Sequence, residues 1–179
     1  MARNVLKVDS FLNHQIDPDL MQQIGEKLTE RLRSTAPTKV LTIETSGIAP
    51  ALATATALHI PLVIARKRRI AGMPHELLQE STLSPTLNQI VQFFVSPEFI
   101  TPADRVVIID AFMTTGQTLL ALARLVRSAR AQVVGIGTVI EKQFEVGRQK
   151  LEPLGVPVES LVKIRIGNDG VISFADEST

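Results

Sequence analysis

The chain has 179 residues, 45% of them hydrophobic and 21% charged, which is typical of one globular domain with its own buried core. Lys and Arg number 19 and Asp and Glu 18, giving a net charge of +1, which argues against a nucleic-acid binder that relies on an electropositive face. Cysteine is absent, so disulfides, thiolate metal sites and thiol nucleophiles are excluded. We therefore expect a single domain over residues 1–179.

No targeting segment is expected. Residues 1–5 lack the apolar run of a secretory signal, and charges or prolines interrupt every apolar stretch before it reaches membrane-spanning length. We expect a cytoplasmic protein with neither a membrane nor a nucleic acid as its partner.

Helices and strands alternate over the first third of the chain. In order, the pattern predicts a helix from Leu20 to Leu32 after the entry signal Asp17-Pro18, a strand over Lys39–Glu44, an Ala-rich helix over Ile48–Leu58 and a strand over Ile60–Ala65. From Arg66 to Asp104 the periodicity weakens and four prolines interrupt it. Because long irregular segments in compact domains are often functional, we expect a flexible flap over residues 67–103.

The alternation returns after this segment. The predicted elements are a strand over Arg105–Asp110, a helix over Leu119–Arg130 and a strand over Val133–Ile140. Strands separated by helices imply parallel pairing through right-handed crossovers. Apolar residues on both sides of Gly167–Gly170 predict a β-hairpin, which we expect outside the parallel sheet as part of a small cap.

The most informative motif is VVIIDAFMTTGQT at residues 106–118. Its apolar strand delivers Asp110 at the carboxyl end, where open α/β sheets bind their ligands. The turn that follows opens a helix, whose N–H groups and positive dipole end suit a phosphate, and Gly116 would let the backbone approach closely. An acid beside a phosphate cradle suits a sugar phosphate. The alternative is that Thr114 and Thr115 only cap the helix.

Two common phosphate-binding loops are not present. The Gly-Lys-Ser/Thr of a P-loop is missing, and Gly135-Ile136-Gly137 lies inside a predicted strand rather than before a helix.

The motif instead resembles the phosphoribosyl pyrophosphate (PRPP) motif of the phosphoribosyltransferase superfamily. Further segments, in order along nearly the whole chain, are similar to the xanthine phosphoribosyltransferase family: Val5–Pro18, Thr42–Pro50, Ala65–Lys67 and Val139–Lys142. The resemblance implies an α/β protein of the type I phosphoribosyltransferase fold, with a mostly parallel sheet flanked by helices. Its core would span about residues 18–145, and a small hood would be built from the terminal segments 1–17 and 146–179.

The resemblance also implies a role for each site residue. The PRPP 5′-phosphate and ribose would be bound by Asp110, Thr114, Thr115, Gly116, Gln117 and Thr118. Pyrophosphate would be bound by Thr45, Ser46, Gly47 and Lys67, and the purine by Leu6, Asn13 and Lys142. Asp110 and Lys67 would be the catalytic residues. Without the resemblance, Asn13 could cap a turn, and Lys67 and Lys142 could be ordinary surface lysines.

A metal held by the protein itself is not expected, because the three histidines have no ligand-like spacing to one another or to acids. The resemblance implies Mg²⁺ delivered with PRPP, on pyrophosphate and ribose oxygens and water.

The implied reaction transfers the phosphoribosyl group from PRPP to a purine, most readily xanthine, in a homodimer. Three positions depart from the family pattern: Ala111 replaces a second acid, and Leu83 and Leu87 replace a tyrosine and a lysine of the flap. If the site is otherwise intact, Ala111→Asp should therefore tighten PRPP binding. These departures leave two alternatives open: a regulatory homologue that binds PRPP or a nucleotide with little catalysis, and a transferase that prefers guanine or hypoxanthine.

Overall fold

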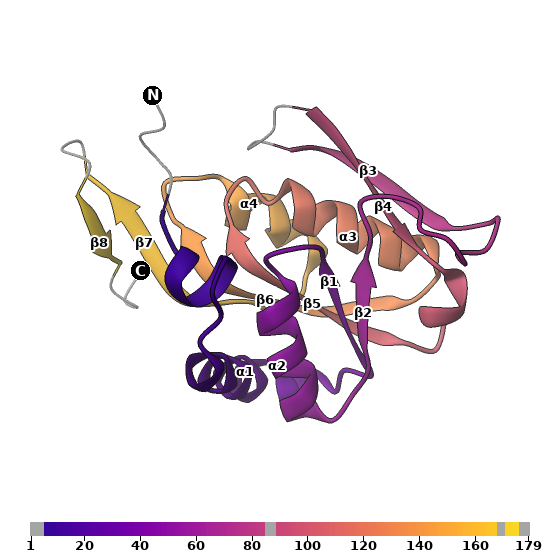
Figure 1. The fold of residues 1–179 in the computed structure, drawn as a ribbon, viewed down its shortest axis with the longest axis horizontal. Coiled ribbons are helices and arrows are strands. Elements are labelled where there is room, and N and C mark those ends of the chain that lie inside the picture. The colour runs from indigo at the N-terminus through magenta and orange to yellow at the C-terminus, as the bar shows by residue number, and fades with distance from the viewer. Residues whose placement is uncertain (1–5, 85–88, 168–170, 176–179) are drawn as a thin grey trace.

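A central six-stranded sheet organises the protein, in the strand order β2-β1-β5-β6-β7-β8 (Figure 1). The computed structural model describes residues 6–84, 89–167 and 171–175. Neighbouring strands from β2 to β7 run parallel, and β8 pairs antiparallel with β7 at the edge. The mostly parallel sheet flanked by helices confirms the expected α/β fold class. The elements, in chain order, are η1 (Asp9–Asn13), α1 (Pro18–Leu32), η2 (Arg33–Thr35), β1 (Lys39–Ile43), α2 (Ile48–Leu58), β2 (Leu62–Ala65), β3 (Leu78–Ser84), β4 (Gln89–Val95), η3 (Pro97–Phe99), β5 (Arg105–Met113), α3 (Gln117–Ser128), β6 (Gln132–Lys142), α4 (Gly147–Leu151), η4 (Glu152–Leu154), β7 (Val158–Ile166) and β8 (Ile172–Phe174).

The predicted start of α1 is confirmed. The Asp17 side chain accepts a hydrogen bond of 3.0 Å from the Leu20 N–H, and Pro18 occupies the first turn, where its missing N–H costs nothing. None of the helices within the described ranges is long and apolar enough to cross a membrane.

Two apolar clusters pack against the sheet, and β5 contributes to both. Val106 and Ile108 belong to the cluster that contains the buried residues of α3. Val107, Ile109 and Ala111 belong to the cluster that contains those of α1 and α2. Since successive side chains of a strand point to opposite faces, the two clusters cover the two faces of the sheet. β5 is therefore a central strand that is buried on both sides.

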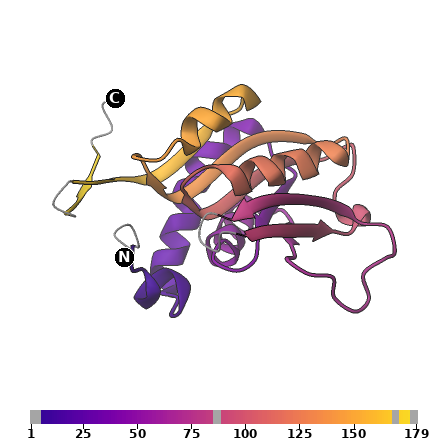
Figure 2. The ribbon, with the colours of Figure 1, turned by 90° about the horizontal axis from the view of Figure 1, so that it is seen from above.

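The segment expected to be an irregular flap contains a regular antiparallel hairpin, β3–β4, so that part of the prediction is wrong. Its register runs from Leu78 opposite Val95 to Ser84 opposite Gln89. Phe93 is 1% exposed and belongs to the same cluster as α3, so tertiary packing compensates for the weak alternation of the sequence. Figure 2 shows the hairpin running alongside α3. Its predicted flexibility stays a prediction.

The predicted terminal hairpin is present as β7–β8, but its placement outside the parallel sheet is wrong for β7. This strand starts at Val158, before the predicted hairpin, and pairs in parallel with β6 from Ile136 opposite Val158 to Lys142 opposite Ile164. The buried side chains of Ser160 and Ile164 make the longer strand part of the central sheet. β8 pairs only with the last residues of β7, and the turn residues 168–170 lie outside the described residues.

Candidate active site

The loop between β5 and α3 surrounds a small cavity of about 20 Å³, lined by residues 112–119. The N-cap of α3 is Gly116, and no side chain makes a capping hydrogen bond there. Thr114 and Thr115 are therefore not the caps of this helix, which contradicts the simple capping alternative. The first N–H groups of a helix have no acceptor within the helix, so this end of α3 is suited to bind an anion.

Two glycines pack against each other below this loop. Gly116 has a φ of 73°, and a Cβ added to it would lie 2.8 Å from the carbonyl oxygen of Gly147. A Cβ added to Gly147 would in turn overlap the carbonyl oxygen of Thr114. The close approach that Gly116 makes within the described chain is thus to the start of α4. No pattern in the sequence singled out Gly147, which the structure places at the start of α4.

Asp110 lies on β5 but not at its end, since the strand continues to Met113. Its side chain is 8% exposed, and Oδ1 accepts a hydrogen bond of 2.7 Å from the N–H of Ala111. Burial raises the pKa of Asp110 to about 7, although the Ala111 N–H and the positive charge of Lys67 both favour the carboxylate. A ligand that brings hydroxyl donors or further positive charge to Asp110 would favour its ionised form.

The Thr45-Ser46-Gly47 loop joins β1 to α2 and lies against Asp110 of β5. Gly47 is buried at the N-cap of α2, and a Cβ added there would lie 2.9 Å from Asp110 Oδ1 and would overlap the Thr42 hydroxyl. A cis peptide bond joins Glu44 to Thr45. The predicted pyrophosphate loop and the predicted ribose-binding acid are therefore direct neighbours in space, although Gly47 and Asp110 are 63 positions apart in the sequence.

Lys67 follows β2, at the same edge of the sheet. Its backbone N–H donates to Glu44 Oε1, and Arg66 Nε lies 3.2 Å from Glu44 Oε2. Arg66 also exchanges two backbone hydrogen bonds of 2.9 Å with Phe94. Glu44 thus ties the end of β1 to the segment that carries Lys67. Sequence reasoning missed this role, although an acid directly before the loop was a possible signal.

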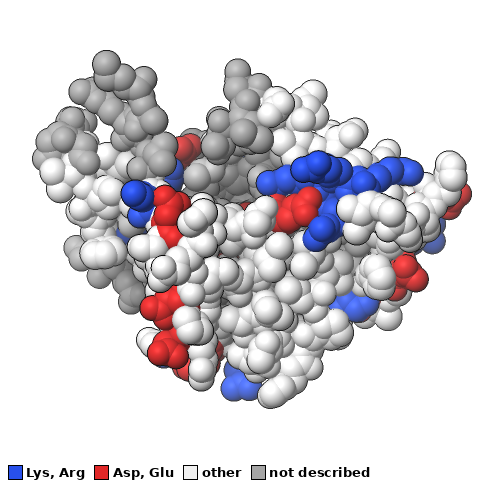
Figure 3. Space-filling view, viewed as in Figure 1, with Lys and Arg blue, Asp and Glu red and all other residues white. Residues whose placement is uncertain are grey.

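The segment Arg66–Arg69 carries four consecutive basic residues. Lys67, Arg68 and Arg69 are exposed, and Figure 3 shows the basic group beyond the end of β2. The arrowheads of β2 and β5 point to the same edge of the sheet in Figure 1, so this positive charge lies at the edge where the two loops meet.

The three predicted purine contacts come from three different elements of the chain. Leu6 is half-buried against the cluster that also contains Ile140 and Ile164, and Lys142 is the last residue of β6. Asn13 is exposed at the end of η1, where Nδ2 lies 3.4 Å from Asp9 Oδ1. This contact joins two side chains and is not a cap on a backbone group, so neither the purine contact nor the turn cap expected for Asn13 is tested by it.

The departures from the family pattern have different surroundings. Ala111 is fully buried in the apolar cluster beneath α1 and α2, whereas Leu83 is 55% exposed near the end of β3. Leu87 lies outside the described residues. Across residues 6–84, 89–167 and 171–175, no group of three or more His, Asp or Glu side chains could hold a metal ion.

Comparison with known proteins identifies the family. Residues 13–167 match the phosphoribosyl transferase domain. A xanthine phosphoribosyltransferase of Geobacillus thermodenitrificans is 48% identical over 99% of this chain and 91% of its own length, and one of Oceanobacillus iheyensis is 42% identical over 99% and 92%. Among solved structures, adenine phosphoribosyltransferase of Rhodothermus marinus has a TM-score of 0.71 at 32% identity, covering 82% of this chain and 81% of its own. That of Thermoanaerobacter pseudethanolicus has a TM-score of 0.73 at 26% identity, covering 82% of each chain. The chain belongs to the phosphoribosyltransferase family, among the relatives that are named xanthine phosphoribosyltransferase.

Proposed function

We propose that the protein transfers the 5-phosphoribosyl group from PRPP to xanthine, with release of pyrophosphate. The observation that carries this proposal is the contact between Gly47 and Asp110, which joins the pyrophosphate loop to the strand that leads into the phosphate loop. Two anion-binding loops on either side of one acid suit a sugar that carries a phosphate at one end and a diphosphate at the other.

Each loop has a distinct role in this proposal. The turn Thr114–Thr118 binds the 5′-phosphate through helix N–H groups and hydroxyls. Asp110 accepts a hydrogen bond from a ribose hydroxyl, and its burial makes a charge-assisted bond of this kind strong. Thr45, Ser46 and Gly47 hold the pyrophosphate together with Lys67.

In the reaction, a purine ring nitrogen forms a bond to the anomeric carbon of PRPP while the bond from that carbon to the diphosphate oxygen breaks. The electron pair leaves with pyrophosphate, and the nitrogen loses its proton to solvent. Lys67 and the N–H groups beside Gly47 stabilise the negative charge that develops on the leaving group. Asp110, when ionised, stabilises the positive charge that develops on the sugar.

Mg²⁺ fits this site as part of the substrate. Both oxygens of Glu44 are engaged by the Arg66–Lys67 segment, which leaves Asp110 as the acid beside the pyrophosphate loop. A single protein carboxylate suits an ion that keeps most of its ligands on phosphate oxygens and water. When bound, the ion would neutralise charge on pyrophosphate.

The choice of base rests on Lys142 and on the relatives. A lysine donates hydrogen bonds and accepts none, so Lys142 favours a purine that presents carbonyl oxygens over adenine. The relatives from Geobacillus and Oceanobacillus carry the name xanthine phosphoribosyltransferase. Leu6 would pack against the base, and Asn13 would have to turn away from Asp9 to reach it.

The deciding experiment measures nucleotide formation with Mg²⁺ and PRPP for xanthine, guanine, hypoxanthine and adenine. We expect the highest kcat/KM with xanthine. A higher value with guanine or hypoxanthine would support the alternative specificity. PRPP binding in calorimetry without turnover of any purine would overturn the transferase proposal in favour of a PRPP-binding regulator.

The assembly and location of the protein stay predictions. The homodimer expected from the family resemblance would be tested by sedimentation equilibrium, and the cytoplasmic location by cell fractionation.

A further inference from the structure

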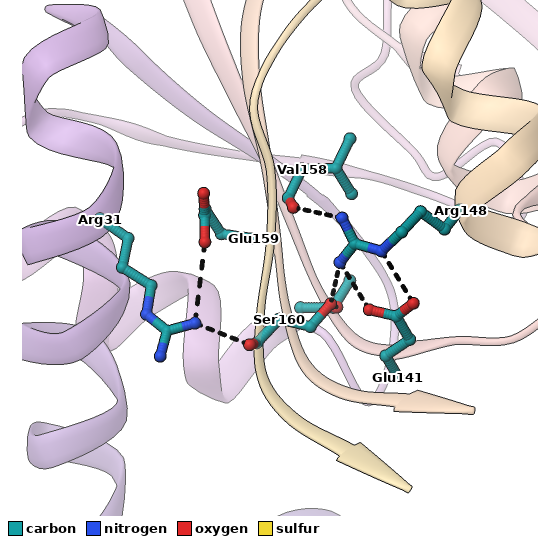
Figure 4. Close-up of polar contacts among 7 residues, drawn as sticks. Arg31, Glu141, Arg148, Val158, Glu159 and Ser160 are labelled. Carbon is teal, nitrogen blue, oxygen red and sulfur yellow. Dashed lines mark hydrogen bonds and ion pairs between the residues drawn. The ribbon is translucent and has the colours of Figure 1, made fainter. Parts of the chain in front are cut away.

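An ion pair between a buried carboxylate and a half-buried guanidinium lies between the end of β6 and the start of α4 (Figure 4). Glu141, directly before Lys142, is 3% exposed. Arg148 donates from Nε to Glu141 Oε1 at 2.9 Å and from Nη2 to Oε2 at 2.6 Å. Two parallel hydrogen bonds between a guanidinium and a carboxylate fix the relative orientation as well as the distance of both groups.

The same guanidinium also reaches β7. Arg148 Nη1 donates to the carbonyl oxygen of Val158 at 2.8 Å, and Nη2 lies 3.3 Å from the hydroxyl of Ser160. Burial alone would raise the pKa of Glu141, but the hydrogen bonds from Arg148 and Ser160 outweigh it and hold the pKa below its ordinary value. Arg148 therefore joins α4 to β6 through a carboxylate that stays charged, and to β7 through the Val158 carbonyl and the Ser160 hydroxyl.

The pair closes a short loop with proposed substrate contacts at both ends. Lys142 follows Glu141 directly, and Gly147, next to Arg148, packs against Thr114 and Gly116 of the phosphate loop. The ion pair thus ties the start of the segment 142–147 to its end. Strand pairing with Ile164 already holds the backbone of Lys142, and the ion pair adds a second constraint on the segment that follows it.

We infer that Glu141 and Arg148 are positioning residues, which set the placement of Lys142 relative to the phosphate loop through the segment 142–147. The inference rests on the proposed function, because it assigns substrate contacts to both ends of this segment. Neither residue is itself proposed to touch a substrate.

If Arg148 only stabilised β7, the loss of another arginine that caps a carbonyl of this strand should have the same effect. Arg31 is such an arginine and serves as the matched control. Arg31, on α1, also caps a carbonyl of β7, with Nη1 donating to Ser160 at 2.8 Å, and its Nη1 lies 3.7 Å from Glu159 (Figure 4). β8 pairs only with Ile164–Ile166. The carbonyls of Val158 and Ser160, to which Arg148 and Arg31 donate, therefore lie in the part of β7 that β8 does not cover. Removal of Arg31 takes away the cap on the Ser160 carbonyl and keeps the donors and acceptors of both hydrogen bonds between Glu141 and Arg148.

The test uses Glu141→Gln/Arg148→Met, because removal of Arg148 alone would leave a buried charge without its partner. Arg31→Met is the control. We expect the double variant to raise the KM for xanthine and for PRPP by on the order of tenfold to a hundredfold, since a small misplacement of positioned groups has effects of this size. Arg31→Met should change both KM values less than about twofold. Equal KM changes in the two variants would overturn the inference.

Hydrogen–deuterium exchange provides a readout that does not depend on turnover. The double variant should exchange faster than the wild type over residues 142–147 and 114–118, and Arg31→Met should not. Unchanged exchange in these segments would overturn the inference even with an active enzyme, whereas a wild type without xanthine turnover would contradict only the proposed function. If the double variant does not fold, Arg148→Lys, which keeps the charge but loses the paired hydrogen bonds, should give the same changes, and wild-type exchange in Arg148→Lys would overturn the inference.

Discussion

Gly147 lies so close to Thr114 that a Cβ on Gly147 would overlap the Thr114 carbonyl oxygen. The start of α4 therefore supports the backbone of the loop that is proposed to bind the 5′-phosphate. The atoms nearest to such a Cβ include backbone atoms of Thr114, which cannot rotate away as a flexible side chain could. A side chain at position 147 would therefore displace the backbone of residues 114–116.

Gly147→Ala should accordingly shift the phosphate loop. We expect PRPP binding to weaken by about tenfold or more, corresponding to at least ~1.4 kcal/mol, in calorimetry on the folded variant. Gly155→Ala is the control, because Gly155 has a φ of 68° but nothing within 4 Å of an added Cβ. That control should lose about 1 kcal/mol of stability through backbone strain and keep its PRPP affinity. Equal affinities of the two variants would contradict the supporting role of Gly147.

Asp110 makes stability depend on pH. An unfolded Asp ionises near its ordinary pKa of 3.8, whereas burial raises the pKa of folded Asp110 to about 7. The folded state therefore holds the proton more tightly, and this contribution is complete below pH 3.8 and is lost as pH rises toward 7. Asp110→Asn should gain stability over the wild type as pH rises from 4 to 8, on the order of 3 kcal/mol, in urea unfolding at each pH.

Asp104 is the control of opposite sign. Burial would raise its pKa, but hydrogen bonds from the N–H and hydroxyl of Thr101 and from Lys39 outweigh it, so the pKa is lowered. Its contribution is present above the unfolded pKa and is lost as pH falls. Asp104→Asn should therefore cost stability at pH 7 and less at pH 3. Parallel pH curves for the two variants would show that burial of Asp110 does not control its proton.

Ala111→Asp should destabilise the protein rather than simply tighten PRPP binding. Ala111 is fully buried in an apolar cluster, so a carboxylate there would lose its hydration. We expect the free energy of unfolding to fall by roughly 2–5 kcal/mol at neutral pH and to recover partly in acid. Ala111→Asn, equal in size but uncharged, should show no such recovery. If Ala111→Asp is as stable as Ala111→Asn and binds PRPP more tightly, the new carboxylate reaches the ribose as the sequence suggested.

Substitutions of Lys142 and Lys67 should affect the KM values of different substrates. Lys142→Ala should raise the KM for xanthine by about tenfold with a small change for PRPP, since a charged donor to a carbonyl contributes ~1.5–3 kcal/mol. Lys67→Ala should do the reverse and also lower kcat, because Lys67 is proposed to stabilise the leaving group. Steady-state kinetics with each substrate varied in turn makes the comparison. A uniform loss for both substrates in both variants would remove these assignments.

The sequence by itself determined the features that depend on neighbouring residues. Asp17 and Pro18 start α1 as predicted, because a cap needs only a side chain and the next N–H groups. The alternation of apolar strands and helices was sufficient to predict a parallel sheet. The motif at residues 106–118 also placed a loop and a helix start after β5, because its turn residues and apolar strand are local signals.

Only the tertiary structure decided which distant segments meet. The hairpin β3–β4 packs against α3, and the backbone of β7 pairs with β6 within the sheet. The contacts of Gly116 with Gly147 and of Glu44 with the Lys67 segment join residues from different strand ends. Such contacts follow from the order of strands in the sheet, which brings the carboxyl ends of β2, β1, β5 and β6 to one edge. The periodicity of the sequence is local and carries no information about the order of the strands.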